Sequence, residues 1–296
     1  MRRLARCKDT LDASGYCTAM TTVAVTGAHG RMGKLIIENI NAAPDMGLVA
    51  AFDIVDIGAP VGMGTGTEGV AGDVAVGITV SDAGEIDSVL ARTSPDVLID
   101  FTIADAAVRN VEAAVRNNVN LVVGTTGLEP YQEEIAGLIA DRVSAVIAPN
   151  FSVGVNLFWK LLADVVSYIG DWDIEVIEAH HRNKKDAPSG TAMHAAAVMS
   201  AVLGGRELVH GREGLSPRGD EIGIHAVRGG DIIGDHTVLF AGDGERIEIK
   251  HQAHSRQAFA GGAIRAARWV VDAPGGVHGM DEVLGLSQPI FYKKIE

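Results

Sequence analysis

Short apolar runs and longer segments with helical spacing alternate along the first half of the chain. The apolar runs have the length of buried strands and occupy residues 22–26, 47–53, 94–101, 120–123 and 144–147. Helices are expected at 34–40 and 104–117, and the glycine-rich residues 56–80 are expected to form a loop with short strands. Because strands and helices that alternate at this spacing build a parallel sheet, we expect a Rossmann-like α/β domain with ligands at the carboxyl ends of its strands.

The pattern changes after about residue 151. Alternating polar and apolar residues predict strands at 173–178, 223–228, 234–240 and 245–251, most of them separated by glycine turns. Helices are expected at 157–169, 191–203 and 259–271, the last returning to the first domain. We therefore expect a first domain over 21–151 and about 262–296. A second α+β domain, built on a mixed or antiparallel sheet with one open face, is expected over 152–261.

Residues 1–20 fit neither domain. Arg2, Arg3, Arg6 and Lys8 make this stretch basic, but no apolar core follows them, so we do not expect a secretory signal. We expect a disordered extension, with the natural beginning of the protein close to Met20.

Composition narrows the functional class. No apolar run approaches the ~20 residues of a membrane-spanning helix, so no membrane partner is expected. A formal net charge of -13 weighs against binding to nucleic acid, whose backbone is itself anionic. The chain has 2 cysteines, Cys7 and Cys17, both near its beginning. A disulfide framework or a cysteine metal site is therefore not expected, and a cytoplasmic location is favoured.

A glycine-rich turn joins the first strand to the first helix, with the sequence Gly27-Ala28-His29-Gly30-Arg31-Met32-Gly33. Glycines let the backbone approach a pyrophosphate, whose charge the helix N-terminus receives. The spacing is a variant, because His29 stands where the usual G-x-G-x-x-G pattern has its second glycine. The turn predicts that the first domain binds a dinucleotide; glycines needed only for packing are the alternative.

Two further loops at strand ends fit the same ligand. Asp53 follows Gly33 at the distance at which a carboxylate holds the ribose hydroxyls of a dinucleotide, although a solvated acid is the alternative. Ile54 stands where a basic residue would read the 2′-phosphate of NADPH, so both NADH and NADPH are candidates and NADH is favoured. The turn Gly124-Thr125-Thr126-Gly127 is suited to lie against the nicotinamide.

A basic run reverses the sign of the chain locally. Residues 180–185 hold two histidines, an arginine and two lysines between the expected strand at 173–178 and the helix at 191–203. Pro188 and Ser189 are typical of a helix start, and the N–H groups of Ser189, Gly190 and Thr191 are expected to be free to bind a carboxylate. Histidine and lysine can both supply a proton or positive charge. A solvated basic loop is the alternative.

Four histidines in the second domain invite a metal interpretation. His225, His236, His251 and His254 lie on or beside the expected strands. Their spacing lacks a compact ligand motif, so we interpret them as ordinary strand histidines and expect no metal site.

Several of these runs together resemble the 4-hydroxy-tetrahydrodipicolinate (dihydrodipicolinate) reductase family from about Thr22 to the mid-280s. The resemblance rests on the glycine turn, the Gly124 turn, the run Asn150-Phe151-Ser152-Val153-Gly154-Val155-Asn156, the basic run through Thr191, and Arg228-Gly229-Gly230-Asp231-Ile232-Ile233-Gly234-Asp235-His236. It implies that a nicotinamide cofactor reduces the cyclic product of aspartate semialdehyde and pyruvate, in the diaminopimelate and lysine pathway. It also implies a homotetramer joined through the sheet of the second domain.

The resemblance implies specific roles for the site residues. His180 is the expected proton donor and Lys184 the second catalytic group. His181, Ser189, Gly190 and Thr191 are expected to hold the carboxylates of a small dicarboxylate substrate. The residues expected to bind the cofactor are Gly27, Ala28, His29, Gly30, Arg31, Met32, Gly33, Asp53, Gly124, Thr125, Thr126, Ala148, Pro149, Asn150 and Phe151.

Two other hypotheses remain at this stage. One is a different amino-acid dehydrogenase of the same architecture, such as an aspartate or homoserine dehydrogenase. The other is an NAD-binding sensor without catalysis, which would need Asp53 and the glycine turn but not His180 beside Lys184.

Overall fold

The computed structural model describes residues 20–64 and 76–286. The expectations for residues 1–19, for the tail from 287 to 296 and for the two cysteines lie outside this range. The chain divides into two compact units. The first comprises the chain up to Pro149 together with Ala260–Val283, and the second comprises Asn150–Phe259 together with the residues from Leu284.

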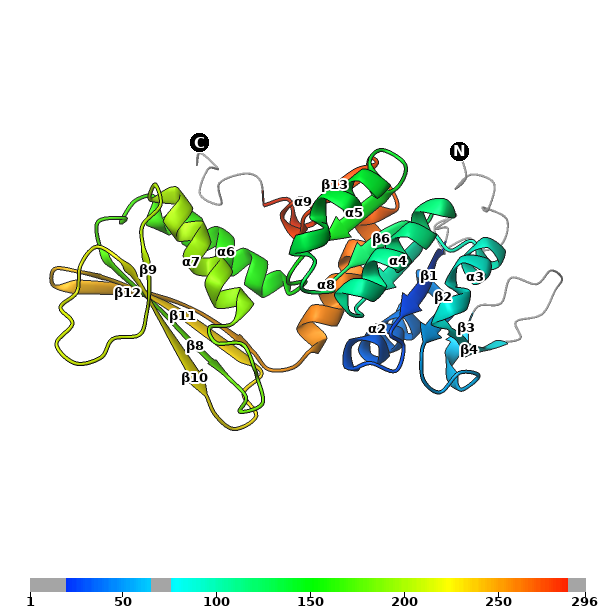
Figure 1. The fold of residues 1–296 in the computed structure, drawn as a ribbon, viewed down its shortest axis with the longest axis horizontal. Helices are drawn as coiled ribbons and strands as arrows, with labels where there is room; N and C mark the ends of the chain where they lie inside the picture. Colours follow the sequence, from blue (N-terminus) through cyan, green and yellow to red (C-terminus); the bar gives the residue numbers. More distant parts are fainter. Residues whose placement is uncertain (1–19, 65–75, 287–296) are drawn as a thin grey trace. The chain divides into compact units, whose positions relative to one another are not determined.

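The first unit is built on one sheet (Figure 1). The order of its described strands is β13 (Gly276–His278), β7 (Ser144–Ile147), β6 (Asn120–Val123), β5 (Val97–Asp100), β1 (Thr21–Thr26), β2 (Met46–Asp53), β4 (Val76–Asp82) and β3 (Pro60–Gly64). All neighbouring pairs are parallel except β3 and β4. Because β1 lies between β2 and β5, the strand order reverses there, and a ligand crevice is expected beside such a reversal.

Apolar side chains from helices and strands form the core of this unit. The helices are α2 (Arg31–Ala42), α3 (Ile86–Thr93), α4 (Ala104–Arg116), α5 (Gln132–Ile139), α8 (Gln257–Val270) and α9 (Met280–Leu284), with short 3₁₀ turns η1 (Ala83–Glu85) and η2 (Glu129–Tyr131). One core cluster joins α3, α4 and α5 to alternate residues of the strands, among them Ala24, Phe52 and Leu98. No helix in the described parts is long and apolar enough to cross a membrane.

The second unit contains a mixed sheet (Figure 1). Its order is β12 (Glu245–Ala253), β11 (Gly234–Gly242), β8 (Asp173–His180), β10 (Ile222–Arg228) and β9 (Leu208–His210). β8 runs parallel to β10 and antiparallel to β11, which confirms the predicted α/β fold with a second, mixed sheet. Helices α6 (Val153–Val166) and α7 (Gly190–Val202) supply Phe158, Leu162 and Met199 to a core that also holds Val176 and Val238.

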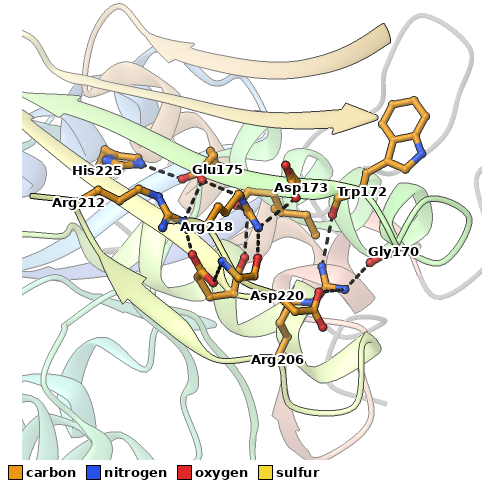
Figure 2. Close-up of polar contacts among 12 residues, drawn as sticks. Gly170, Trp172, Asp173, Glu175, Arg206, Arg212, Arg218, Asp220 and His225 are labelled. Carbon is orange, nitrogen blue, oxygen red and sulfur yellow. Dashed lines mark hydrogen bonds and ion pairs between the residues drawn. The ribbon is translucent and has the colours of Figure 1, made fainter. Parts of the chain in front are cut away.

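The other face of this sheet carries a polar cluster and apolar residues. Figure 2 shows Glu175 of β8 between His225, Arg212 and Arg218. His225 Nε2 lies 2.8 Å from Glu175 Oε2, and Arg218 Nε lies 3.2 Å from Glu175 Oε1. On the same face Ile177 and Val227 are 40% and 48% exposed.

Some element boundaries differ from the predictions. α6 begins at Val153 rather than at residue 157, because the Ser152 hydroxyl accepts a hydrogen bond from the N–H of Val155 and caps the helix earlier. α6 also ends at Val166, before the predicted end at residue 169. Within 56–80, the described residues form β3 and the first part of β4, which agrees with the expected loop with short strands.

Candidate active site

Glu178 and His180 form a buried pair at the carboxyl end of β8. They are two residues apart, so both side chains lie on the face of the strand that carries Ile174 and Val176 in the core. Glu178 has no exposed surface and His180 has 8%, and Glu178 Oε2 lies 2.6 Å from His180 Nδ1. This contact orients the imidazole and leaves its Nε2 for other partners.

Arg228 and Ser189 complete the surroundings of the Glu178 carboxylate. The Arg228 guanidinium donates from Nη1 to Oε2 and from Nη2 to Oε1, both at 2.8 Å. The N–H of Ser189 donates to Oε1 at 2.9 Å. Burial alone would raise the pKa of Glu178, but the hydrogen bonds from Arg228, His180 and Ser189 lower it below its ordinary value. Glu178 is therefore a buried carboxylate that acts as an acceptor.

The pKa of His180 is also lowered. Burial disfavours the charged imidazolium and outweighs the opposite effect of Glu178, and the positive charges of Lys184 and Arg228 act in the same direction as burial. The neutral imidazole then donates from Nδ1 to Glu178, and Nε2 carries the lone pair. Once protonated at Nε2, His180 is a stronger acid than an ordinary histidine, which suits proton donation.

Lys184 lies on the loop that follows β8. Its ammonium is 2.8 Å from Asp186 Oδ2, and its backbone N–H donates to the carbonyl of His181. Burial would raise the pKa of Asp186, but hydrogen bonds from Lys184 and from backbone N–H groups, including that of Gly190, lower it. The Lys184 ammonium is therefore positioned by an anionic neighbour, and the side chain is 22% exposed.

The start of α7 differs from the prediction. The N–H of Ser189 was expected to be free, but it donates to the Glu178 carboxylate, because both residues are buried and lie against each other. The Ser189 hydroxyl accepts from the N–H of Ala192 and lies 3.1 Å from His236 Nε2. Gly190 is exposed, and Thr191 accepts a hydrogen bond at its hydroxyl from Asn150 Nδ2 at 3.2 Å.

His236 was interpreted as an ordinary strand histidine, but it packs against the candidate catalytic residue. Its ring meets that of His180 edge-on with centroids 5.2 Å apart. Burial lowers the pKa of His236 to about 4, so this imidazole is neutral near pH 7. The alternation of 234–240 could have placed His236 on the face of Val238 and Phe240, which is the face of His180. Among the described residues, no group of three or more His, Asp or Glu side chains is arranged to hold a metal ion.

The glycine turn of the first unit fits a dinucleotide. Gly27 has a φ of 65°, which favours glycine. A Cβ at Gly33 would lie 2.0 Å from the carbonyl oxygen of Gly27, and one at Gly30 would lie 3.0 Å from it. The turn therefore closes to a compact cradle at the start of α2, which has no side-chain cap. The first-turn N–H groups of such a helix lack intrahelical acceptors and can receive a phosphate.

The backbone donors of the turn are used unequally. The N–H of Ala28 donates to Phe52, that of Gly30 donates to Gly27, and that of His29 donates to Asp53 Oδ2 at 2.8 Å. The donors left for a pyrophosphate are therefore those of Arg31, Met32 and Gly33 in the first turn of α2. Asp53 also accepts from the N–H of Ile54, whose side chain is 79% exposed.

Gly124 and Thr125 pack against the loop that follows β5. A Cβ at Gly124 would lie 2.2 Å from the ring of Phe101, so only glycine fits there. Thr125 is buried and its hydroxyl donates to Asp100 at 2.6 Å, whereas Thr126 is exposed. Sequence reasoning missed Phe101, Thr102 and Asp100, although their position directly at the end of a predicted strand was a usable signal.

The remaining expected cofactor residues divide between the units. Ala148 is buried and donates its N–H to the carbonyl of Val123, and Pro149 is exposed at the end of the first unit. Asn150 begins the second unit, where its carbonyl accepts from Asn156 Nδ2. Phe151 is 1% exposed. The structure thus gathers His180, His181, Lys184 and the start of α7 in the second unit, and the glycine turn, Asp53 and Gly124–Thr126 in the first.

Comparison with known families matches both halves of the chain. Residues 21–151 match the family described as dihydrodipicolinate reductase, N-terminus, and residues 154–284 match dihydrodipicolinate reductase, C-terminus. A 4-hydroxy-tetrahydrodipicolinate reductase of Methanosarcina acetivorans is 55% identical over 269 residues, covering 90% of this chain and all of that protein. One from Methanothermobacter thermautotrophicus is 52% identical over 283 residues, with 90% and 100% covered.

Solved structures resemble the fold. Dipicolinate-bound dihydrodipicolinate reductase from Paenisporosarcina sp. TG-14 has a TM-score of 0.71 and 28% identity, covering 89% of this chain and 98% of that chain. An amine dehydrogenase from Mycobacterium smegmatis has a TM-score of 0.55 and 15% identity, covering 88% and 95%. At that identity the second match reflects the fold alone.

Proposed function

The chain belongs to the dihydrodipicolinate reductase family, and on this premise we propose that it reduces 4-hydroxy-tetrahydrodipicolinate to tetrahydrodipicolinate in diaminopimelate and lysine biosynthesis. The observation that carries the proposal is the match of both family halves along 21–151 and 154–284. The buried Glu178–His180 pair beside Lys184 supports it, because the reaction needs an acid and positive charge near a small dianion.

A reduced nicotinamide cofactor would supply the hydride, and the 4-hydroxyl group of the substrate would leave as water, which together with one proton balances the reaction. The glycine cradle and the first-turn N–H groups of α2 would hold its pyrophosphate, and Asp53 would hold the ribose hydroxyls. Asp53 and the exposed Ile54 favour NADH, because a carboxylate repels a 2′-phosphate and no cation follows it directly. We expect a higher kcat/KM with NADH than with NADPH, and the reverse order would overturn this preference while leaving the reaction in place.

The substrate is a small dicarboxylate in this proposal. The structural relative from Paenisporosarcina is bound to dipicolinate, a flat dicarboxylate of this size. His181, Lys184 and the N-terminus of α7 at the exposed Gly190 and the half-buried Thr191 would hold its carboxylates. Ser189 would act through its contacts with Glu178 and His236 rather than through a free N–H.

The chain's own residues would move the proton. Glu178 holds Nδ1 of His180, so Nε2 is the atom that carries the proton to the substrate. The lowered pKa of His180 favours release of that proton once it is bound. Lys184 would stabilise negative charge on the substrate, since its ammonium is held at the loop by Asp186.

Single substitutions at the end of β8 and on the loop that follows it test the assignment. We expect Lys184→Met and His180→Asn to lower kcat about 100-fold or more, the usual contribution of a positioned acid. Lys185→Met is the matched control, because Lys185 is the exposed neighbour, and it should stay near wild type. NADH binding should be unchanged in all three. Turnover retained in both site variants would contradict the proposed chemistry.

The other hypotheses predict different results. Oxidation of homoserine, or turnover of an aspartate-pathway aldehyde without activity on the cyclic substrate, would favour a related dehydrogenase. NADH binding without hydride transfer to any of these would favour a sensor. We also propose that the protein is a homotetramer, which is supported by the apolar residues on the open face of the second sheet. We propose a cytoplasmic location as well, which is supported by the position of both cysteines in the first twenty residues.

A further inference from the structure

We propose that Asp100, at the carboxyl end of β5, is a positioning residue that fixes the three loops around the nicotinamide cofactor. The inference rests on the proposed function, because it assigns a role toward the cofactor of that reaction. Asp100 has no exposed surface. Neither the sequence motifs nor the resemblance pointed to it.

Hydrogen-bond donors surround the Asp100 carboxylate. Oδ1 accepts from Thr125 Oγ1 at 2.6 Å and from Thr102 Oγ1 at 2.9 Å. Oδ2 accepts from Asn110 Nδ2 at 2.6 Å and from Thr26 Oγ1 at 2.8 Å. No Lys, Arg or His is among the hydrogen-bond and ion-pair partners recorded for it in the described parts of the chain.

This environment is costly unless every donor is in place. A buried carboxylate without a cation is stabilised only by dipoles aimed at it, and losing one leaves part of its desolvation uncompensated. The donors come from four separate places: Thr26 ends β1, Thr102 follows β5 by two residues, and Asn110 belongs to α4. Thr125 follows β6 by two residues. Asp100 therefore joins three adjacent strands at the edge where a cofactor binds.

The same contacts fix the backbone of the cofactor loops. Thr125 Oγ1 accepts from the N–H of Thr102 at 2.9 Å, so the hydroxyl that donates to Asp100 also holds the loop after β5. The methyl group of Thr102 would lie 3.3 Å from a Cβ at Gly27, the first residue of the glycine turn. Gly124 closes on the Phe101 ring. A shift of Asp100 would thus move the glycine turn and the Gly124 turn together.

Asp96 offers a matched control on the same two strands. Its Oδ2 accepts from Thr22 N at 2.8 Å and from Thr22 Oγ1 at 2.7 Å, just before β5 begins. It therefore ties β1 to the segment before β5 at the amino ends of the strands, away from the loops that would hold the cofactor. A carboxylate that only stabilises the sheet should behave like Asp96. A positioning residue should act on the cofactor instead.

The experiment compares Asp100→Asn with Asp96→Asn in the full-length enzyme. We expect Asp100→Asn to raise the KM for NADH at least tenfold, with kcat lowered less and the Kd for dipicolinate unchanged. Asp96→Asn should leave the KM for NADH within twofold of wild type even if it lowers Tm. Thr125→Val should reproduce part of the KM increase, and adding it to Asp100→Asn should produce little further change because both remove one network.

The outcomes separate the inference from the proposed function. If wild type turns over and Asp100→Asn keeps the wild-type KM for NADH, or if both Asp variants raise that KM equally, the positioning role is wrong. If Asp100→Asn does not fold, Thr125→Val decides the question by the same KM measurement. If wild type does not reduce the substrate, the proposed function fails, and the Kd for NADH measured by fluorescence still tests whether Asp100 positions this cofactor.

Discussion

Glu178 governs His180 through one short contact, and it is itself held by partners far away in the sequence. Its carboxylate is paired with Arg228, 50 residues along the chain, and with the N–H of Ser189. Neutralising Glu178 therefore has two effects. It removes the group that raises the pKa of His180, and it leaves Arg228 half-buried without its anion.

We expect Glu178→Gln to shift the pH dependence of turnover. Burial and the nearby cations already lower the pKa of His180, and loss of Glu178 lowers it further, so less imidazolium is available as pH rises. The basic limb of the kcat profile should move to lower pH. The unpaired guanidinium should lower the free energy of unfolding by about 3 kcal/mol.

Arg228→Gln separates these two effects. It removes the ion pair but keeps the carboxylate on His180 Nδ1, so its free energy of unfolding should fall similarly while the pH limb moves less. Measurement of kcat from pH 5 to 9 and urea denaturation give both quantities. A pH limb that stays at the wild-type position in Glu178→Gln would show that Glu178 does not set the pKa of His180.

His236 should make the second unit sensitive to acid. Its folded pKa of about 4 lies below the ordinary value of 6.5, so between these values the unfolded chain binds more protons and stability falls as pH falls. From pH 7.5 to 5 the loss is about 2 kcal/mol for this group. In His236→Gln the loss should shrink by that amount.

Urea denaturation at pH 7.5 and pH 5 measures the effect. His254→Gln removes an exposed imidazole close to β12 and serves as the control, which should lose stability as wild type does. An equal loss in His236→Gln and wild type would mean that His236 is protonated in the folded protein at pH 5.

At the residue scale, the sequence predicted residue types better than their partners. His180 and Lys184 stood out because charge and histidine content reverse locally in 180–185. The prediction that the N–H of Ser189 is free was wrong. Its acceptor, Glu178, lies 11 residues earlier in the sequence, and the fold brings the two together. Asp100 was missed for the same reason: its donors come from four separate positions in the chain.

The pairing of β8 with β10 places Gly223 directly opposite Glu175. A Cβ at Gly223 would lie 1.8 Å from Glu175 Oε2, so the carboxylate lies over this glycine while it contacts Arg218 and His225 (Figure 2). We expect Gly223→Ala to lower the free energy of unfolding by 1–3 kcal/mol, roughly the cost of overpacking, because displacing the carboxylate breaks these contacts.

Gly229→Ala is the matched control for this prediction. Gly229 follows the same strand and nothing lies within 4 Å of its Cβ position, so the added methyl group should change stability little. Chemical denaturation of both variants measures the two free energies of unfolding and tests the prediction. Equal stability of Gly223→Ala and wild type would mean that the Glu175 cluster rearranges without cost.

At the scale of elements, strong periodicity predicted most strands and helices, and weak periodicity hid the rest. Alternation gave β8, β10, β11 and β12, because one face of each is buried or half-buried. Helices α3 and α5 have 8 residues each, too short to give a clear helical pattern without their strand neighbours. β9 and β13 have 3 residues each and form only through pairing with β10 and β7.

For the whole molecule, the change from apolar runs to alternating segments predicted two different sheets. A parallel sheet is buried on both faces, whereas a sheet covered on one face alternates. The alternation does not predict what covers the face of the second sheet that is turned away from α6 and α7. That face carries Ile177 and Val227 together with Leu239, a combination that is typical of a surface for another subunit.

The proposed homotetramer can be tested on this face. Ile177 lies on β8, the middle strand, with β11 on one side and β10 on the other. An aspartate there would place an unpaired charge inside an apolar contact between subunits, so Ile177→Asp should dissociate an assembly of four 31.0 kDa chains into smaller species. Tyr168→Asp, at an exposed position just after α6, is the control and should keep the wild-type mass. Light scattering after gel filtration gives the masses, and far-UV circular dichroism checks that both variants fold. If Ile177→Asp folds and keeps the mass of the wild-type tetramer, the subunit interface lies elsewhere, because a buried unpaired charge at the centre of the interface would weaken the assembly.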